Sequence, residues 1–137
     1  MEHFNHDIKG KTIAIWGLSF KPNTDDMREA PSIVIINKLI DAGAIVKAYD
    51  PVALEEAQLR INKKDVQYVD DQYETILDAD ALIIVTEWSE FRAPRFPIME
   101  KLMKKKVIFD GRNIYEPKEM KEFGYTYYAI GRQTYND

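Results

Sequence analysis

Short runs of apolar and β-branched residues alternate along the chain with longer stretches that have the period of a helix. Most of the short runs are nearly continuous in apolar residues and do not alternate with polar ones, and they are Thr12 to Trp16, Ile45 to Tyr49, Val66 to Val69, Ala81 to Thr86, Val107 to Asp110 and Tyr125 to Ile130. Strands that are apolar throughout are typical of parallel sheets with helices on both faces. The pattern therefore predicts parallel strands connected by helices.

The stretches between these runs carry the start and stop signals of helices. Pro31 stands near the first position of one predicted helix and Gly43 follows its end, while Asp71 and Glu74 have the spacing of a capping box. The predicted helices are Pro31 to Ala42, Ala53 to Leu59, Asp71 to Leu77, Pro97 to Lys104 and Pro117 to Phe123. Right-handed crossovers join such elements into an α/β, Rossmann-like three-layer sandwich with a doubly wound parallel sheet of five to six strands.

Composition narrows the function classes. The chain has 137 residues, with 19 basic and 23 acidic side chains, two histidines and no cysteine, a length that suits one domain. The acidic balance and the short apolar runs predict no nucleic-acid partner, no membrane partner and a cytoplasmic location. Without cysteine, this chain has no thiolate nucleophile and no zinc–thiolate site. His3 and His6 have no further ligands nearby, so we expect no metal site.

The only basic run, Lys104 to Lys106, follows a predicted helix. Cations near a helix end suit the helix dipole. We therefore expect these lysines to be solvated and not to bind nucleic acid.

Ligands of such sheets bind beyond the carboxyl ends of the strands. The segment after the first strand lacks the G-x-G-x-x-G fingerprint of NAD-binding domains, so Asp50, at a ribose-binding position after the second strand, is only a weak sign of NAD. That segment holds Lys21 and Arg28 beside two aspartates. It is either an anion or nucleotide-sugar site, because both cations suit phosphate, or a solvated turn of ion pairs.

Two further segments follow predicted strands. Arg112, after the fifth strand, offers another cation at the same edge, or it bonds to Asp110 or caps a helix. Glu87 and Trp88, after the fourth strand, are interpreted as a structural and a packing residue, because no partner for acid–base chemistry is visible.

Residues Lys11 to about Arg132 resemble the C-terminal, UDP-binding domain of the UDP-glucose/GDP-mannose dehydrogenase family. The resemblance rests on four motifs in order: GLSFKPNTDDMREAPS at 17–32, YDP at 49–51, TEWSEF at 86–91 and FDGRN at 109–113. TDDMRE and TEW are most similar to the UDP-glucose 6-dehydrogenase branch. The alternatives are the UDP-N-acetylmannosamine or GDP-mannose branch, a stand-alone nucleotide-sugar-binding module without redox activity, and, last, a structural subunit.

The resemblance implies oxidation of UDP-glucose to UDP-glucuronate by two hydride transfers to NAD, through a thiohemiacetal and a thioester on a cysteine. This chain holds neither that cysteine nor the glycine fingerprint, so we expect no catalytic residue in it and no activity from it alone. An N-terminal NAD domain and central helices of the same enzyme, a homodimer, would supply them. Residues 1–10 look like the end of the central segment, 11–132 like the UDP-sugar-binding domain and 133–137 like a tail.

The resemblance also implies roles for particular positions. Phe20 and Lys21 match residues that reach the UDP-sugar across the cleft between domains. Arg112 matches an arginine near the nucleotide-sugar, and Arg28 matches one that extends toward NAD. The neighbouring aspartates would shape the loop.

Overall fold

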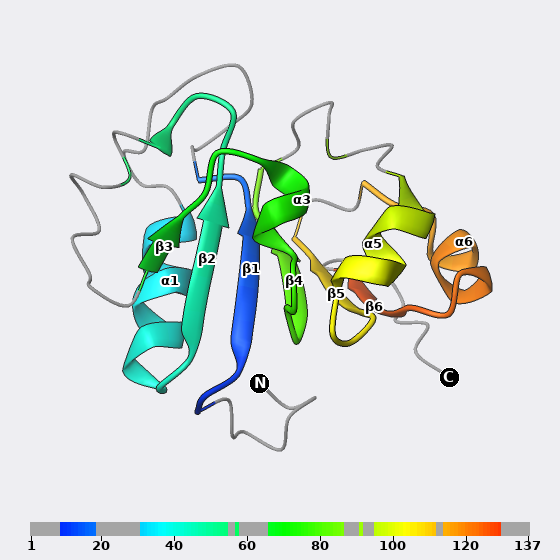
Figure 1. Ribbon diagram of the computed structural model, residues 1–137, viewed down its shortest axis with the longest axis horizontal. Helices are drawn as coiled ribbons and strands as arrows, with labels where there is room; N and C mark the ends of the chain where they lie inside the picture. Colours follow the sequence, from blue (N-terminus) through cyan, green and yellow to red (C-terminus); the bar gives the residue numbers. More distant parts are fainter. Residues whose placement is uncertain are drawn as a thin grey trace.

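The computed structural model describes residues 9–18, 31–54, 57, 66–86, 91, 95–111 and 114–129. Within them, one sheet is formed by β1 (Thr12–Trp16), β2 (Ile45–Tyr49), β3 (Val66–Tyr68), β4 (Ala81–Ile84), β5 (Val107–Asp110) and β6 (Thr126–Ala129). The strand order is β3-β2-β1-β4-β5-β6, and all neighbouring pairs are parallel (Figure 1). The predicted fold class is confirmed, and the strand order reverses between β1 and β4.

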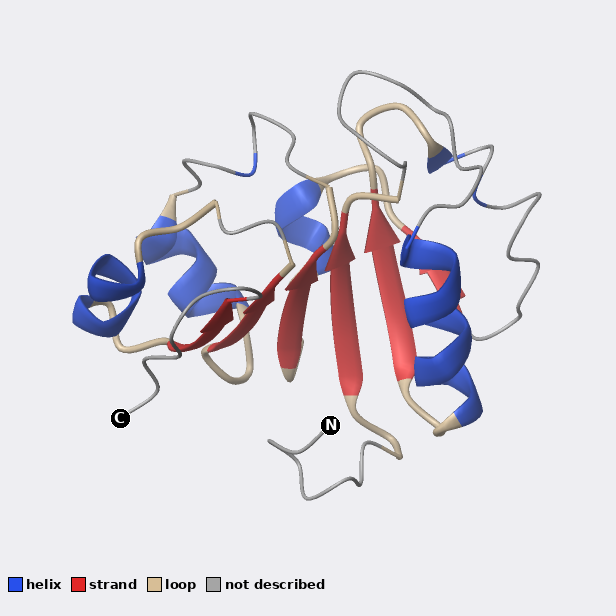
Figure 2. Ribbon diagram, turned by 180° about the vertical axis from the view of Figure 1, so that it is seen from behind, coloured by secondary structure: helices blue, strands red, loops and turns tan. Residues whose placement is uncertain are grey.

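Helices cover both faces of the sheet. α1 (Pro31–Asp41) lies on one face, as the view from behind in Figure 2 shows, whereas α3 (Gln72–Thr75), α5 (Phe96–Leu102) and α6 (Pro117–Glu122) belong to the other. Successive side chains of β1 point to opposite faces, so Ile13 and Ile15 pack in the core under α1, while Ala14 and Trp16 pack in the second core. Both faces are therefore buried, which explains why most strands are nearly continuous in apolar residues.

The predicted strands end close to the observed ones. β1, β2 and β5 have the predicted bounds, and β3 ends one residue before its predicted end. β6 begins one residue after its predicted start, and its predicted end at Ile130 lies outside the described residues. β4 ends at Ile84, two residues before the predicted end at Thr86. Ile84 is the last residue of β4 that pairs with β5, and its carbonyl accepts the N–H of Gly111 across 2.9 Å as the chain after β5 turns away.

The helices also begin near their predicted starts. Asp71 is the N-cap of α3, and its Oδ2 accepts the N–H of Glu74 across 2.8 Å. α5 stops at Leu102, before the predicted end, because the N–H groups of Lys104 and Lys105 donate to the carbonyl of Ala79 instead. Of the short helix predicted after β2, residues 55, 56, 58 and 59 lie outside the described part of the chain. None of the helices among the described residues is long and apolar enough to cross a membrane.

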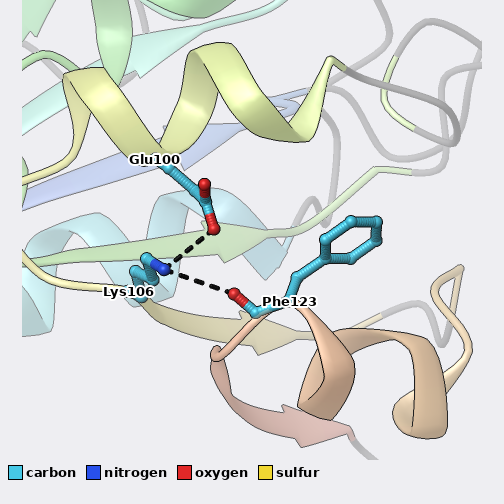
Figure 3. A network of polar contacts seen from close by, with 3 residues as sticks. All are labelled: Glu100, Lys106 and Phe123. Carbon is cyan, nitrogen blue, oxygen red and sulfur yellow. Dashed lines mark hydrogen bonds and ion pairs between the residues drawn. The ribbon is translucent and has the colours of Figure 1, made fainter.

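The basic run after α5 is only partly solvated. Lys104 and Lys105 are exposed as predicted, but Lys106 is half-buried. Its Nζ pairs with Glu100 at 2.8 Å and donates to the carbonyl of Phe123 at 3.3 Å (Figure 3). Phe123 is the C-cap of α6. Lys106 therefore lies at the C-terminal end of α6, the helix after the run, and not at the end of α5, the helix before it.

Candidate functional site

The carboxyl ends of β2, β1, β4 and β5 lie side by side at one edge of the sheet, here called the carboxyl edge. This arrangement follows from parallel pairing, in which all strands end on the same side. The segments that begin there start at Asp50, Gly17, Val85 and Gly111. The fold therefore gathers at one edge the beginnings of the four segments that the sequence singled out.

Asp50 fastens the end of β1 to the end of β2. Its buried carboxylate accepts the N–H of Leu18 through Oδ2, and those of Val52 and Ala53 through Oδ1, all across 2.8 Å. Hydrogen bonds to a charged acceptor are stronger than neutral ones. Asp50 occupies the position at which an acid binds the ribose in a dinucleotide-binding fold. Here it anchors the residues that directly follow β1 and β2.

Gly17 brings the end of β1 against the end of β4. Its φ of +98° lies in the left-handed region, and its N–H donates to the carbonyl of Tyr49 across 2.8 Å. A Cβ at this position would lie 2.5 Å from the Cβ and 2.6 Å from the backbone nitrogen of Thr86. Only glycine satisfies both conditions, because a side chain would be strained and would also clash with backbone.

The long segment between β1 and α1 is fastened at both ends. Ser32, in the first turn of α1, is fully buried, and its Oγ donates to the carbonyl of Leu18 across 2.6 Å. Leu18 is therefore held through both its N–H and its carbonyl. Three sequence-predicted site residues fall within this segment, but Phe20, Lys21 and Arg28 lie outside the described residues.

The end of β5 is organised around a second buried aspartate. Oδ2 of Asp110 accepts the N–H of Ile114 at 2.7 Å, the N–H of Tyr115 at 3.2 Å and the hydroxyl of Tyr127 at 2.5 Å. These bonds hold Ile114 and Tyr115 close to the last residue of β5. Arg112 itself lies outside the described residues, as do Glu87, Trp88, His3 and His6.

An aromatic cluster lies beneath the carboxyl edge. The ring of Phe91 stacks on that of Trp16, with centroids 5.1 Å apart, and meets Tyr49 edge-on at 6.0 Å. The hydroxyl of Tyr115 donates to the carbonyl of Phe91 across 2.5 Å. Burial, followed by the charge of Asp110, raises the pKa of Tyr115 well above its usual range, so the hydroxyl keeps the proton that it donates.

The sequence analysis did not identify the roles of Phe91, Tyr115 and Tyr127. One signal was available, because Phe91 ends the TEWSEF motif and Tyr115 follows FDGRN by two residues. Large side chains just past two neighbouring strand ends are well placed to pack together. No periodicity, however, marks Tyr127 as different from the other tyrosines around it.

A cavity of about 370 Å³ lies beside the carboxyl end of β3, lined by Leu54, Tyr68, Val69, Asp70 and Glu74. Its two carboxylates repel a phosphate group. Among the described residues, the ends of β1, β4 and β5 are therefore the better place for a phosphate-bearing ligand. Arg112, Lys21 and Arg28 follow two of those ends in the sequence.

The fold is that of a doubly wound α/β domain, a class of protein in which ligands bind beyond the carboxyl ends of the strands. Residues 14–117 match the UDP-binding domain of the UDP-glucose/GDP-mannose dehydrogenase family. The chain belongs to this family.

Two curated relatives show how similar the chain is to known members. It is 48% identical over 126 residues to a UDP-glucose 6-dehydrogenase of Rhizobium meliloti, covering 92% of this chain and 28% of the relative. It is 45% identical to the UDP-glucose 6-dehydrogenase TuaD of Bacillus subtilis, covering 91% of this chain and 27% of that protein. The chain thus spans less than a third of the length of either relative.

Solved structures are similar in fold. The NDP-N-acetyl-D-galactosaminuronic acid dehydrogenase of Methanosarcina mazei matches with a TM-score of 0.80 and 30% identity, over 96% of this chain and 27% of that one. A UDP-glucose dehydrogenase of Pyrobaculum islandicum matches with a TM-score of 0.73 and 30% identity, over 86% of this chain and 26% of that one.

Proposed function

We propose that this chain is the nucleotide-sugar-binding domain of an NAD-dependent UDP-glucose 6-dehydrogenase. The observation that carries the proposal is the similarity to the two curated UDP-glucose 6-dehydrogenases, at 48% and 45% identity over nearly the whole chain. A UDP-N-acetylmannosamine dehydrogenase from Pyrococcus horikoshii is 29% identical. The UDP-glucose dehydrogenase of Pyrobaculum islandicum is 30% identical, so the choice of UDP-glucose rests on the two curated relatives.

The ligand in this proposal lies at the carboxyl edge, with Phe20, Lys21 and Arg112 against the UDP-sugar and Arg28 toward NAD. The described frame supports this placement, because the bonds of Leu18 and Asp110 fasten the two segments that carry these residues. A diphosphate carries concentrated negative charge. Lysine offers a point charge and arginine a planar fork to such a group.

This chain would bind and orient the substrate while other parts of a longer protein carry out the oxidation. The chain contains no cysteine, so the nucleophile that the family uses would come from elsewhere in that protein. NAD accepts the hydride, and its main binding domain would precede this one. We further propose that the complete enzyme is a homodimer in the cytoplasm, with residues 1–10 ending its central segment and 133–137 forming a tail.

The test is to sequence the coding DNA upstream of the codon for Met1, express the complete reading frame and follow NADH formation. UDP-glucose, UDP-N-acetylmannosamine and GDP-mannose are offered in parallel. The proposal predicts a kcat/KM for UDP-glucose about 100-fold above the others. A stop codon directly upstream, or preference for another sugar nucleotide, would overturn it.

The site is tested in the same protein with Lys21→Ala. Loss of a charge-assisted contact to phosphate should lower kcat/KM for UDP-glucose by about 10- to 100-fold. Lys38→Ala, on the exposed side of α1, is the matched control and should leave the value unchanged. Equal activity of both variants would count against the assignment of Lys21.

A further inference from the structure

Tyr127 reaches the carboxyl edge from a strand that the proposed site does not otherwise use. Its side chain is fully buried in β6, and its Oη lies 2.5 Å from Oδ2 of Asp110 and 3.2 Å from the carbonyl of Tyr115. A phenol has one proton to donate, and a carboxylate is the stronger acceptor. Tyr127 therefore donates to Asp110.

The same carboxylate oxygen holds the far end of the turn after β5, through the N–H groups of Ile114 and Tyr115. The near end is held by Gly111, whose N–H donates to the carbonyl of Ile84 across 2.9 Å. One end of this turn is thus bonded to β4, and the other is bonded through Asp110 to β6.

The bonds continue to the segment after β4. The hydroxyl of Tyr115 donates to the carbonyl of Phe91, whose ring stacks on Trp16 at the end of β1. A buried path therefore runs from Tyr127 through Asp110 and Tyr115 to Phe91. It connects β6 with the segments that follow β5 and β4.

We propose that Tyr127 is a positioning residue for nucleotide-sugar binding. Its hydroxyl holds the carboxylate of Asp110, and the carboxylate holds Ile114 and Tyr115, which follow Arg112 closely in the sequence. The inference rests on the proposed function, in which Arg112 contacts the nucleotide-sugar. Without the hydroxyl, Asp110 loses one of its buried donors and the turn is held less firmly, which weakens substrate binding without touching the hydride-transfer step.

The test is Tyr127→Phe in the complete enzyme, because this change removes the hydroxyl and keeps the ring. KM for UDP-glucose should rise about three- to tenfold, the loss expected for one hydrogen bond, while kcat and KM for NAD stay within about twofold. Tyr128→Phe is the control, since Tyr128 points to the opposite face and stacks on Phe109 at 4.8 Å. Lower thermal stability with an unchanged KM, or equal losses in every kinetic parameter, would show a merely structural role and overturn the proposal.

Hydrogen exchange separates this inference from the proposed function. In Tyr127→Phe the amide protons of Ile114 and Tyr115 should exchange about tenfold faster than in the wild type, and in Tyr128→Phe they should not. A wild-type enzyme that does not oxidise UDP-glucose would overturn the proposed function and the ligand assignment with it. Unchanged exchange at both amides would overturn the positioning role itself, whether or not the enzyme is active.

Discussion

The backbone N–H of Leu18 donates to the carboxylate of Asp50 across 2.8 Å, and this bond joins the end of the first strand to the end of the second. An acid after the second strand of a dinucleotide-binding fold would instead be free for a ribose. Here two further backbone N–H groups, of Val52 and Ala53, bond to the same carboxylate. Asp50 therefore holds Leu18, the last described residue before the segment that contains Lys21.

Asp50→Asn should destabilise the domain by about 2 kcal/mol, because an amide turns its NH₂ group toward backbone N–H groups that now donate to a carboxylate. Urea denaturation of the wild type and the variant measures the difference. Asp71→Asn is the matched control. It changes an exposed N-cap to another good N-cap and should cost less than about 0.5 kcal/mol. Equal effects at the two positions would contradict the anchoring role of Asp50.

Gly17→Ala should cost at least about 3 kcal/mol, because the new Cβ meets both a left-handed backbone and the backbone of Thr86. Gly10→Ala separates the two causes. Gly10 also has a positive φ, of +78°, but a Cβ there has open space, so only the backbone cost of about 1 kcal/mol applies. The free energies of unfolding of the two variants, each compared with that of the wild type, measure the two costs. A loss at Gly17 no larger than that at Gly10 would show that the contact with Thr86 is unimportant.

Lys106→Met should destabilise the domain by about 1 kcal/mol, mainly because the carbonyl of Phe123 loses its donor. The ion pair with Glu100 contributes little, because the two side chains are 39% and 36% exposed and water screens their charges. Glu100→Gln should therefore change the free energy of unfolding by less than about 0.5 kcal/mol. A larger effect for Glu100→Gln than for Lys106→Met would reverse this ranking.

Stability should fall at alkaline pH. Burial, followed by the charge of Asp110, raises the pKa of Tyr115 above its usual value near 10, and burial, followed by the charge of Glu100, raises the pKa of Tyr125. Above about pH 10 the unfolded chain loses protons that the folded chain keeps. The stabilisation is therefore complete below this pH and is lost as the pH rises further.

Urea denaturation between about pH 8 and pH 11 measures this decline. The free energy of unfolding of Tyr115→Phe should decline less steeply with pH, because its titrating hydroxyl is gone. The difference in slope should correspond to about one proton. Tyr128→Phe keeps Tyr115, so its free energy of unfolding should decline with pH as that of the wild type does. Identical pH slopes for the wild type and Tyr115→Phe would show that Tyr115 ionises at the same pH in both states.

Much of the fold could be predicted from the sequence, because both faces of the sheet are buried. The runs that form β1, β2 and β5 are mostly apolar and do not alternate with polar residues, and their predicted bounds agree with the observed ones. The ends of β4 and α5 were not, since they depend on bonds to distant residues such as Gly111 and Ala79. Local periodicity shows which face a residue takes but not where a partner strand stops.

The candidate site could be predicted only in part. Its location at the strand ends follows from the parallel topology, and its chemistry from the cations in the loops. The anchors could not be predicted, because Tyr127 and Asp110 meet through strand pairing between residues far apart in the sequence. Asp50 illustrates the same limit, since its place after β2 was clear but its bond to Leu18 was not.

We propose above that this domain serves the oxidation of UDP-glucose by a longer protein. The most direct test is to count the NADH molecules formed per UDP-glucose by the protein from the complete reading frame. Conversion of an alcohol to a carboxylate removes two hydrides, so we expect two NADH per UDP-glucose, with UDP-glucuronate as the product. No NADH from UDP-glucose, or one NADH with an aldehyde as the final product, would contradict it.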